Sequence, residues 1–402
     1  MKKKLYIWVL LCMVLLGCTD KSYRGSFDLN GTYYKNSRLP VWIKIGEPTD
    51  LLSKAGGESS IAGRRFHVYA FNKDAVSSYA VTNEEDKLNT LIDGTLDDAG
   101  VKAGREAYWD RGYERVLWAD GLDVYWPQGD GVDYRYDFFA YYISNMKLES
   151  KDFKREKDKV SLNIEIDGMQ DLMSAKASTP EEKFVALFPD EKERVYYQHY
   201  WCYSYDAAMM NINPEFIFKR HLVKLNFRLA AGVTEGASNM IHLKSLTASS
   251  KYKGEFVVAV RGESENVGLY FTNDKKDLEL RESDGSPLAD NYVIHTRESG
   301  TAPYTYKDMD GSLLVAPANA YKLNLSFEEL KQGETKVTPY NYSVSIYRGG
   351  EKEYSEMFEP GNEYLVTFTV SGRMDISVDV TLAKWGPGGY VAPDTEGRPN
   401  NI

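Results

Sequence analysis

Apolar and polar side chains alternate along most of this chain, at the spacing of two that places every second side chain on one face of a β-strand. Near the N-terminus, Val41, Ile43 and Ile45 alternate with Trp42 and Lys44. The same pattern recurs at residues 66–70, 134–138, 162–166, 223–229, 323–327, 364–370 and 376–382. Glycine, proline, asparagine and aspartate bound these runs and supply the turns. The pattern therefore predicts many short, half-buried strands.

The order of these strands predicts an all-β fold of two tandem antiparallel β-sandwich domains. Each domain is expected to open with a pair of strands, at 39–46 and 65–71 in the first and at 221–230 and 240–247 in the second. Proline and asparagine interrupt the pattern at residues 211–214. We therefore expect an N-terminal sandwich over residues 37–212 and a C-terminal sandwich, ending in a short tail, over residues 213–402.

Helices are expected to be few, under about a fifth of the chain. Residues 82–91, with two acids in the first turn, are predicted to form one helix. The sequence Thr-Pro-Glu-Glu at residues 179–182 matches a helix start, with a capping hydroxyl followed by proline and acids. The charged run at residues 151–159 is predicted to be a solvated loop.

The N-terminus begins with three lysines, followed by an uncharged apolar run at residues 5–16. A membrane-spanning helix needs about 20 apolar residues, so the run fits the apolar core of a secretory signal instead. It ends in Leu-Leu-Gly before Cys18, which resembles the lipobox where bacterial lipoproteins are cleaved before a lipid-bearing cysteine. We therefore predict a signal peptide at residues 1–17, lipid attachment at Cys18, and a tether at residues 18–36. An ordinary signal peptide with an incidental cysteine is the alternative.

The net charge and the cysteine count reduce the number of possible functions. The formal net charge is −10, and removal of a signal with three lysines and no acid would bring it to −13. An acidic body is a poor partner for nucleic acid, because phosphates need a basic face. Cys12 lies in the signal and Cys18 is the lipid site, so Cys202 remains alone and no internal disulfide is expected. The stability of the body must therefore come from buried apolar area.

The sequence holds no complete catalytic motif: the Gly-x-Ser-x-Gly elbow, the phosphate-binding Gly-x-x-x-x-Gly-Lys loop and His-Glu-x-x-His are all absent. The five histidines are scattered, and we interpret His67 and His221, which lie in strand patterns, and Cys202 as structural. Acidic turns at residues 93–98 and 308–311 lack the spacing of a calcium loop. We therefore expect no enzyme, no metal site and no cofactor. A glycosidase with two carboxylates far apart in sequence remains an alternative.

Five groups of residues carry a further signal through their order and spacing. They are FHVYAF at 66–71, YDFFAYY at 136–142, IEI at 164–166 with DLM at 171–173, HLVKLNF at 221–227, and FEPGNEY at 358–364 before a strand that ends at Trp385. In this order, after a lipoprotein start, they resemble the fimbrillin family of type V surface pili. The resemblance covers nearly the whole mature chain.

Membership would imply two transthyretin-like β-sandwich domains and a structural or adhesive subunit of cell-surface fimbriae, exported as an outer-membrane lipoprotein. Such subunits assemble by β-strand complementation, in which a strand of another chain completes an open sheet edge. Carried onto this sequence, the removable strand is residues 39–46. Val41, Ile43 and Ile45 would then fill the groove that the strand leaves when it is removed.

The processing site that the resemblance implies is Arg64 or Arg65, where an arginine-specific protease would cut unusually close to the next strand. Arg38 precedes the first strand, so a cut there would open nothing. The tail after Trp385 carries three prolines, which lack backbone donors. We therefore expect a tip, accessory or anchoring subunit rather than a stalk subunit. Its expected partners are other fimbrial subunits, the outer membrane through the lipid anchor, and a host or bacterial surface ligand.

A surface glycan-binding lipoprotein is the competing interpretation. Aromatic residues crowd at 125–126 and 196–203, and an exposed ring can stack on a sugar or anchor a partner. Tyrosines on two-sided strands more often bury the ring and keep the hydroxyl wet. Exposed tryptophan pairs on one face and a permanent first strand would distinguish the glycan binder.

Overall fold

The computed structural model describes residues 39–46, 61, 63–73, 90–93, 103–110, 112–127, 134–144, 148–156, 159–178, 184–185, 188–200, 202–234, 238–261, 267–298, 305–348, 356–372 and 375–383. Of these described residues, 60% lie in strands and 6% in helices. The predicted all-β fold is therefore confirmed. Within the same ranges, no helix has the length and apolar character needed to span a membrane.

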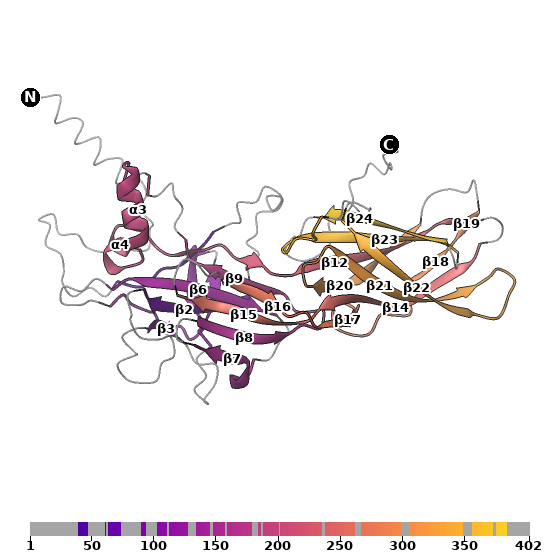
Figure 1. The fold of residues 1–402 in the computed structure, drawn as a ribbon, viewed down its shortest axis with the longest axis horizontal. Helices are drawn as coiled ribbons and strands as arrows, with labels where there is room; N and C mark the ends of the chain where they lie inside the picture. Colours follow the sequence, from indigo (N-terminus) through magenta and orange to yellow (C-terminus); the bar gives the residue numbers. More distant parts are fainter. Residues whose placement is uncertain are drawn as a thin grey trace, which may run out of the picture. The chain divides into compact units, whose positions relative to one another are not determined.

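The first sheet consists of β2 (Arg65–Asn72), β3 (Thr90–Asp93), β4 (Arg105–Asp110), β5 (Arg115–Trp118), β6 (Tyr136–Ile143), β9 (Leu172–Lys176) and β11 (Lys219–Arg220). Its order is β11-β9-β6-β2-β4-β5, with β3 beside β2, and Figure 1 labels β2, β3, β6 and β9 of this sheet. Tyr69 of β2 and Tyr141 of β6 are fully buried and stack on each other. The hydroxyl of Tyr141 donates to the carbonyl of Ala103 at 2.7 Å, so the buried polar tip is satisfied.

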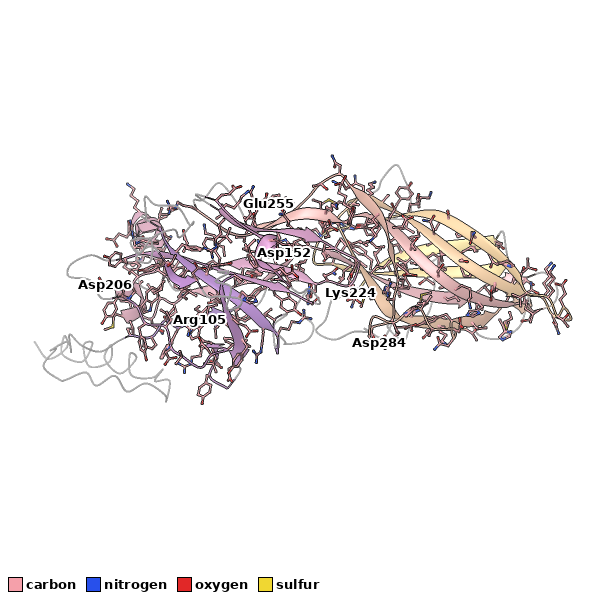
Figure 2. The ribbon with its side chains drawn as sticks, turned by 90° about the horizontal axis from the view of Figure 1, so that it is seen from below. Arg105, Asp152, Asp206, Lys224, Glu255 and Asp284 are labelled. Atoms are coloured by element: carbon pink, nitrogen blue, oxygen red, sulfur yellow. The ribbon has the colours of Figure 1, made fainter. Side chains whose placement is uncertain are left out.

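The second sheet consists of β7 (Phe153–Arg155), β8 (Lys159–Glu165), β15 (Lys253–Val260) and β16 (Gly268–Phe271), in the order β16-β15-β8-β7. Glu255, labelled in Figure 2, belongs to β15. Its Oε1 lies 2.9 Å from the Nζ of Lys159 in the neighbouring strand β8. Phe256 packs edge-on against Tyr141 of the first sheet, with ring centroids 6.2 Å apart. Pairing of β8 with β15 crosses residue 212, and the division of the chain into domains at that residue stays a prediction.

The third sheet consists of β12 (Val223–Ala231), β20 (Tyr306–Val315), β23 (Glu363–Gly372) and β24 (Asp375–Ala383), in the order β20-β12-β23-β24. The fourth consists of β14 (Met240–Lys251), β17 (Lys275–Glu279), β18 (Val293–His295), β21 (Ala320–Leu330) and β22 (Thr338–Tyr347), in the order β17-β14-β21-β22 with β18 beside β14. The period of two correctly predicts the buried residues of β12, β21 and β23, which include Phe227, Phe327 and Phe368. The hydroxyl of Tyr342 in β22 donates to the carbonyl of Ile376 in β24 at 3.0 Å. The third and fourth sheets therefore meet along these two strands.

Three strand pairs in the described part are parallel, where the sequence predicts antiparallel pairing. They are β12 with β23, β1 (Lys44–Ile45) with β10 (Glu215–Phe216), and β13 (Val233–Thr234) with β19 (Arg297–Glu298). In the longest of these pairs, Glu363 of β23 is 3% exposed. Its Oε1 lies 3.4 Å from the Nζ of Lys224 and accepts a hydrogen bond from Asn226. The buried carboxylate is thus paired rather than left alone.

Two helices, α3 (Glu191–Tyr200) and α4 (Tyr205–Met209), lie between β9 and β11 along the chain. α4 begins after Ser204, whose hydroxyl accepts a hydrogen bond from the N–H of Ala207 at 3.2 Å. One prediction about local structure is wrong, and another fails in its described part. Residues 90–91, the end of the expected helix at 82–91, lie in strand β3, and residues 82–89 lie outside the described part. The expected loop at 151–159 contains the 3-10 turn η2 (Ser150–Asp152) and β7, because Phe153 pairs with β8.

Candidate assembly site at residues 40–46

Residues 40–46, called the first segment below, are extended and bonded along the edge of the first sheet. The N–H of Val41 donates to the carbonyl of Val124 at 2.7 Å, next to a bridge between Pro40 and Tyr125. The N–H of Val116 in β5 donates to the carbonyl of Ile43 at 2.9 Å. Because β5 is the last strand of the first sheet, the first segment covers the edge that β5 would otherwise present to solvent.

The first segment is also bonded on a second side. The N–H groups of Lys44 and Gly46 donate to the carbonyls of Pro214 and Phe216, each at 2.9 Å. These bonds form the short parallel pair of β1 with β10. Residues 44–45 are the part of the predicted strand 39–46 that has regular strand pairing. The first segment therefore joins two backbone edges that come from distant parts of the chain.

Two of the three predicted groove-filling side chains are in the core. Val41 is 4% exposed and Ile43 is 0% exposed, whereas Ile45 is half-buried. The role of these residues as a removable filling stays a prediction.

Trp42, between the two buried residues, contacts a cation that the sequence does not single out. The guanidinium carbon of Arg115, the first residue of β5, lies 5.7 Å from the Trp42 ring centroid. The same carbon lies 5.4 Å from the ring centroid of Tyr113. A guanidinium within about 6 Å of an aromatic centroid is attracted by the ring. Arg115 and the two rings therefore form a stack, called the Arg115 stack below, that ties the first segment to β5.

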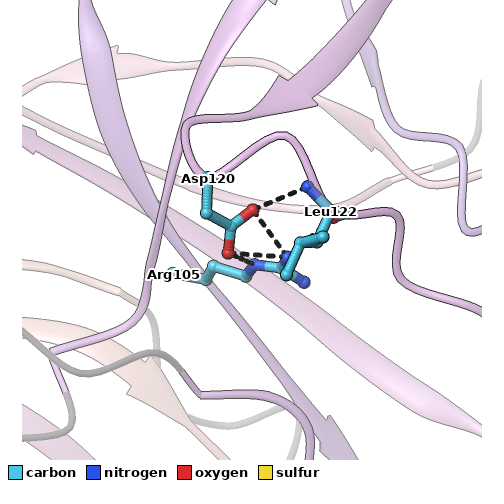
Figure 3. A network of polar contacts seen from close by, with 3 residues as sticks. All are labelled: Arg105, Asp120 and Leu122. Carbon is cyan, nitrogen blue, oxygen red and sulfur yellow. Dashed lines mark hydrogen bonds and ion pairs between the residues drawn. The ribbon is translucent and has the colours of Figure 1, made fainter.

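A second arginine shapes the loop between β5 and Val124 (Figure 3). Arg105 of β4 donates to Asp120 through Nε at 3.1 Å and through Nη2 at 2.8 Å, and to the carbonyl of Leu122 at 2.7 Å. The N–H of Leu122 donates back to Asp120 at 3.0 Å. The hydrogen bond from Arg105 lowers the pKa of Asp120 from its ordinary value. This arrangement fixes the loop that delivers Val124 to the first segment.

Arg64 and Arg65, the predicted processing residues, are held in two different ways. Arg64 Nη1 lies 2.7 Å from the Oδ2 of Asp171, and the Arg64 guanidinium lies 5.0 Å from the Tyr142 ring centroid. Arg65 is the first residue of β2 and its side chain pairs with Glu106 of β4 at 2.9 Å. A protease would have to remove Arg64 from its carboxylate, or unpair the start of β2, before it could cut. Cleavage at either residue stays a prediction.

Asp171, which pairs with Arg64, belongs to a buried polar cluster. The Nε of Arg220 lies 3.4 Å from the Oδ2 of Asp171, and both side chains are about nine-tenths buried. Next to Arg220, the Nε2 of His221 is 2.7 Å from the hydroxyl of Ser174. Burial lowers the pKa of His221 to about 4, against a weaker opposing effect of Asp171. His221 is therefore neutral at ordinary pH and serves as a hydrogen-bonding core residue.

The remaining candidate positions give no chemical site. Cys18 lies outside the described residues, so lipid attachment stays a prediction. Cys202 is buried, and burial raises the pKa of its thiol to about 12, which suppresses the reactive thiolate. The described ranges contain no group of His, Cys, Asp or Glu side chains arranged to hold a metal ion.

Comparison with known proteins gives similarity at the level of solved structures. No protein-family model and no curated protein matches the chain. The chain is similar to a candidate cell adhesion protein of Bacteroides ovatus, at 11% identity and a TM-score of 0.33 over 87% of this chain and 98% of that one.

Two fimbrial proteins of Porphyromonas gingivalis are similar to the chain at 10% identity. The anchor protein Mfa2 has a TM-score of 0.34 over 87% of this chain and 98% of its own. The tip protein Mfa3, with a C-terminal truncation, has a TM-score of 0.34 over 86% of this chain and 99% of its own. These neighbours are of the class that the sequence motifs indicate. At such identities and TM-scores the likeness decides nothing about function, which has to come from the chain itself.

Proposed function

We propose that this chain is a structural or adhesive subunit of cell-surface fimbriae, in which the first segment acts as a complementing strand. The observation that carries the proposal is the first segment's double set of backbone bonds, to Val116 and Val124 on one side and to Pro214 and Phe216 on the other. A strand in such a position satisfies two open edges at once. Open edges of this kind are what another chain completes in β-strand complementation.

The buried side chains of the first segment give the strand an energetic role. Full burial of Val41 and Ile43 contributes about 1.5–3 kcal/mol each. Their sum, about 3–6 kcal/mol, reaches the lower end of the net stability of a small domain, about 5–15 kcal/mol. A body that lost the first segment would therefore be destabilised and would need a replacement strand.

The surroundings of Arg64 and Arg65 favour a tip, accessory or anchoring subunit over a stalk subunit. Arg64 is paired with a largely buried Asp171, and Arg65 lies in the β2–β4 ladder. A protease therefore finds neither arginine free in the folded chain. A subunit that keeps its first strand can end or anchor a fibre, with a lipid on Cys18 holding it to the outer membrane. Its partners would be other fimbrial subunits and a host or bacterial surface ligand.

Electron microscopy of cells that carry a copy tagged after Trp385 tests this function. We expect gold label at the ends or bases of surface filaments, and fewer or shorter filaments when the gene is deleted. A copy with Ile43→Asp should fold poorly and label few filaments, and the matched variant at half-buried Ile45, Ile45→Asp, should reduce labelling less. Label found only away from filaments, together with unchanged filaments in the deletion strain, would contradict the proposal.

A further inference from the structure

The first segment is held on two chemically different sides. Val41 and Ile43 are buried in the core, and Trp42 lies between them in sequence. The ring of Trp42 contacts the guanidinium of Arg115, whose other neighbour is Tyr113. Tyr113 is 61% exposed, so the Arg115 stack lies at the surface. The position is therefore sensitive to the middle residue of the strand as well as to the two apolar residues that flank it.

Arg115 lies against the side chain of that middle residue, Trp42. The next residue, Val116, donates the backbone hydrogen bond to Ile43, so the register of the first segment on β5 fixes Trp42 beside Arg115. Within the described residues, the Nε of Arg115 is buried without a hydrogen-bond partner. The contacts that the structure shows for this guanidinium are the two rings. An aliphatic side chain in place of Trp42 would remove one ring and return nothing polar to the buried group.

We propose that Arg115 determines which strand can occupy the position of the first segment, by selecting an aromatic residue between two β-branched apolar residues. The inference rests on the proposed function, because it names the chemistry of the strand that complements this subunit. The occupant is this chain's own first segment, with its pattern of Val41, Trp42 and Ile43, and a strand of another subunit would need the same pattern to displace it. Ring stacking supplies selectivity, whereas the backbone bonds accept any extended chain.

Strand exchange in the full chain tests this inference. A recognition site for a specific protease is inserted within residues 47–60, which lie outside the described part, and the chain is cut after folding. The first segment then stays in place without a covalent link to β2. A fluorescent peptide of residues 37–48 is added, and its incorporation is followed by anisotropy. Unlabelled peptides compete for the same position.

The peptide series separates the effect of an aromatic ring at position 42 from the effect of apolar side-chain volume. A Trp42→Phe peptide keeps a ring and should compete within about threefold of the unaltered peptide, because the ring-cation attraction persists. A Trp42→Leu peptide keeps apolar bulk and should compete about tenfold less well, which corresponds to about 1.4 kcal/mol. The control peptide, Ser37→Ala, is changed outside the first segment and should compete as the unaltered one does. In a cut chain with Arg115→Gln, the Trp42 and Leu peptides should compete equally.

The outcomes separate this inference from the function on which it rests. If the unaltered peptide never enters the cut chain, the complementing-strand role fails, and the inference fails with it. The Trp42→Leu peptide could instead compete as well as the unaltered peptide for the cut chain that keeps Arg115. That result would overturn the inference alone. Should Arg115→Gln fold poorly, a double-mutant cycle of Trp42→Leu and Arg115→Met, which removes the cation and keeps an apolar stem, gives the same answer in the uncut chain through urea unfolding. Additive effects there would overturn the selection by Arg115, and non-additive effects support it.

Discussion

Arg105 and Asp120 form a two-point ion pair, with Nη2 of the arginine 2.8 Å from each carboxylate oxygen of the aspartate. The pair spans the start of β4 and the loop after β5, and the same arginine donates to the carbonyl of Leu122. Leu122 itself is 67% exposed, so its position depends on these polar bonds rather than on burial. The pair therefore holds the backbone that leads to Val124, which accepts the N–H of Val41.

Asp120→Asn should loosen this side of the first segment. Loss of the ion pair, worth about 1 kcal/mol for an exposed pair, should raise the amide hydrogen-exchange rate of Val41 about fivefold. The amide of Gly46, which bonds to Phe216 on the other side, should change less and serves as the internal control. Exchange measured by NMR distinguishes the two amides. Equal acceleration of both would contradict a local role for Asp120.

The pH dependence of this effect has a definite sign. The hydrogen bond from Arg105 lowers the pKa of Asp120 in the folded chain. The stabilisation is therefore present above the ordinary carboxyl range and is lost as pH falls through the lowered pKa. Glu279→Gln is the matched control, because Glu279 pairs with Arg281 at 3.2 Å on an exposed surface. That variant should leave Val41 exchange unchanged at every pH.

Ile43→Ala should destabilise the chain far more than Ile45→Ala. Ile43 is fully buried and Ile45 is half-buried in the same segment. A buried isoleucine cut to alanine loses about 2–5 kcal/mol through lost transfer energy and a residual cavity. The half-buried residue should lose less than about 1.5 kcal/mol. Urea unfolding followed by tryptophan fluorescence gives both values, and equal losses would show that burial in the first segment does not matter.

His221 should make stability depend on pH between about 4 and 6.5. Burial lowers its folded pKa to about 4 from the ordinary 6.5, so the unfolded chain binds the proton first as pH falls. Stability is therefore full above 6.5 and declines as pH falls toward 4, by up to about 3 kcal/mol. Urea unfolding at a series of pH values checks this. His221→Gln, which can still bond to Ser174, should flatten the decline.

The control for that series is His295→Gln, which alters an exposed histidine at the end of β18. It should leave the pH dependence of the free energy of unfolding as it is in the unaltered chain. If the decline in the free energy of unfolding persisted in His221→Gln and disappeared in His295→Gln, the effect would belong to His295 and not to His221. Such a result would also remove the argument that burial keeps His221 neutral.

Alternation of apolar residues was sufficient to predict the strands that lie on a half-buried sheet face. Phe227 and Phe327 are buried where the period of two places them. In β12 and β21 one face of the strand is buried and the other is half-buried, so the local pattern and the tertiary structure agree. In β2 the residues from Val68 to Asn72 are all buried, because sheets or loops cover both faces, and there alternation carries less information.

The candidate site was only partly visible in the sequence. Val41 and Ile43 follow the alternation, so their burial could be predicted. The Arg115 stack could not, because it depends on which distant residue of β5 lies beside Trp42. The parallel pairing of β1 with β10 has the same origin. Pairing of this kind is decided by the whole fold, whereas residue patterns report local faces. Tyr113, two residues before Arg115, was the one local signal that could have directed attention to the stack.

Gly311→Ala should be strongly destabilising, because this position of β20 allows no side chain. A Cβ atom there would lie 1.6 Å from the carbonyl oxygen of Arg281, which is backbone and cannot swing away. Overpacking of this kind costs about 1–3 kcal/mol, and more where backbone must move. Gly372→Ala at the end of β23 is the control, with no atom within 4 Å of the added Cβ. It should change the free energy of unfolding by less than about 0.5 kcal/mol, and similar losses in both variants would contradict the close approach.

Cys18→Ala should abolish lipid attachment, whereas Cys12→Ala should preserve it. The prediction depends on the apolar run at residues 5–16 and on the Leu-Leu-Gly sequence before Cys18. Each acyl methylene buried in a bilayer contributes about 0.8 kcal/mol, so two or more chains bind a protein stably to a membrane where a single chain does not.

Cells are grown with labelled palmitate, and the protein is recovered through a tag after Trp385. Label should enter the unaltered protein and Cys12→Ala. In Cys18→Ala the label should be absent, and the protein should leave the membrane fraction or accumulate with its signal uncleaved. Equal labelling of Cys18→Ala and Cys12→Ala would show that Cys18 is not the lipid site, and the anchoring part of the proposed function would then have to be abandoned.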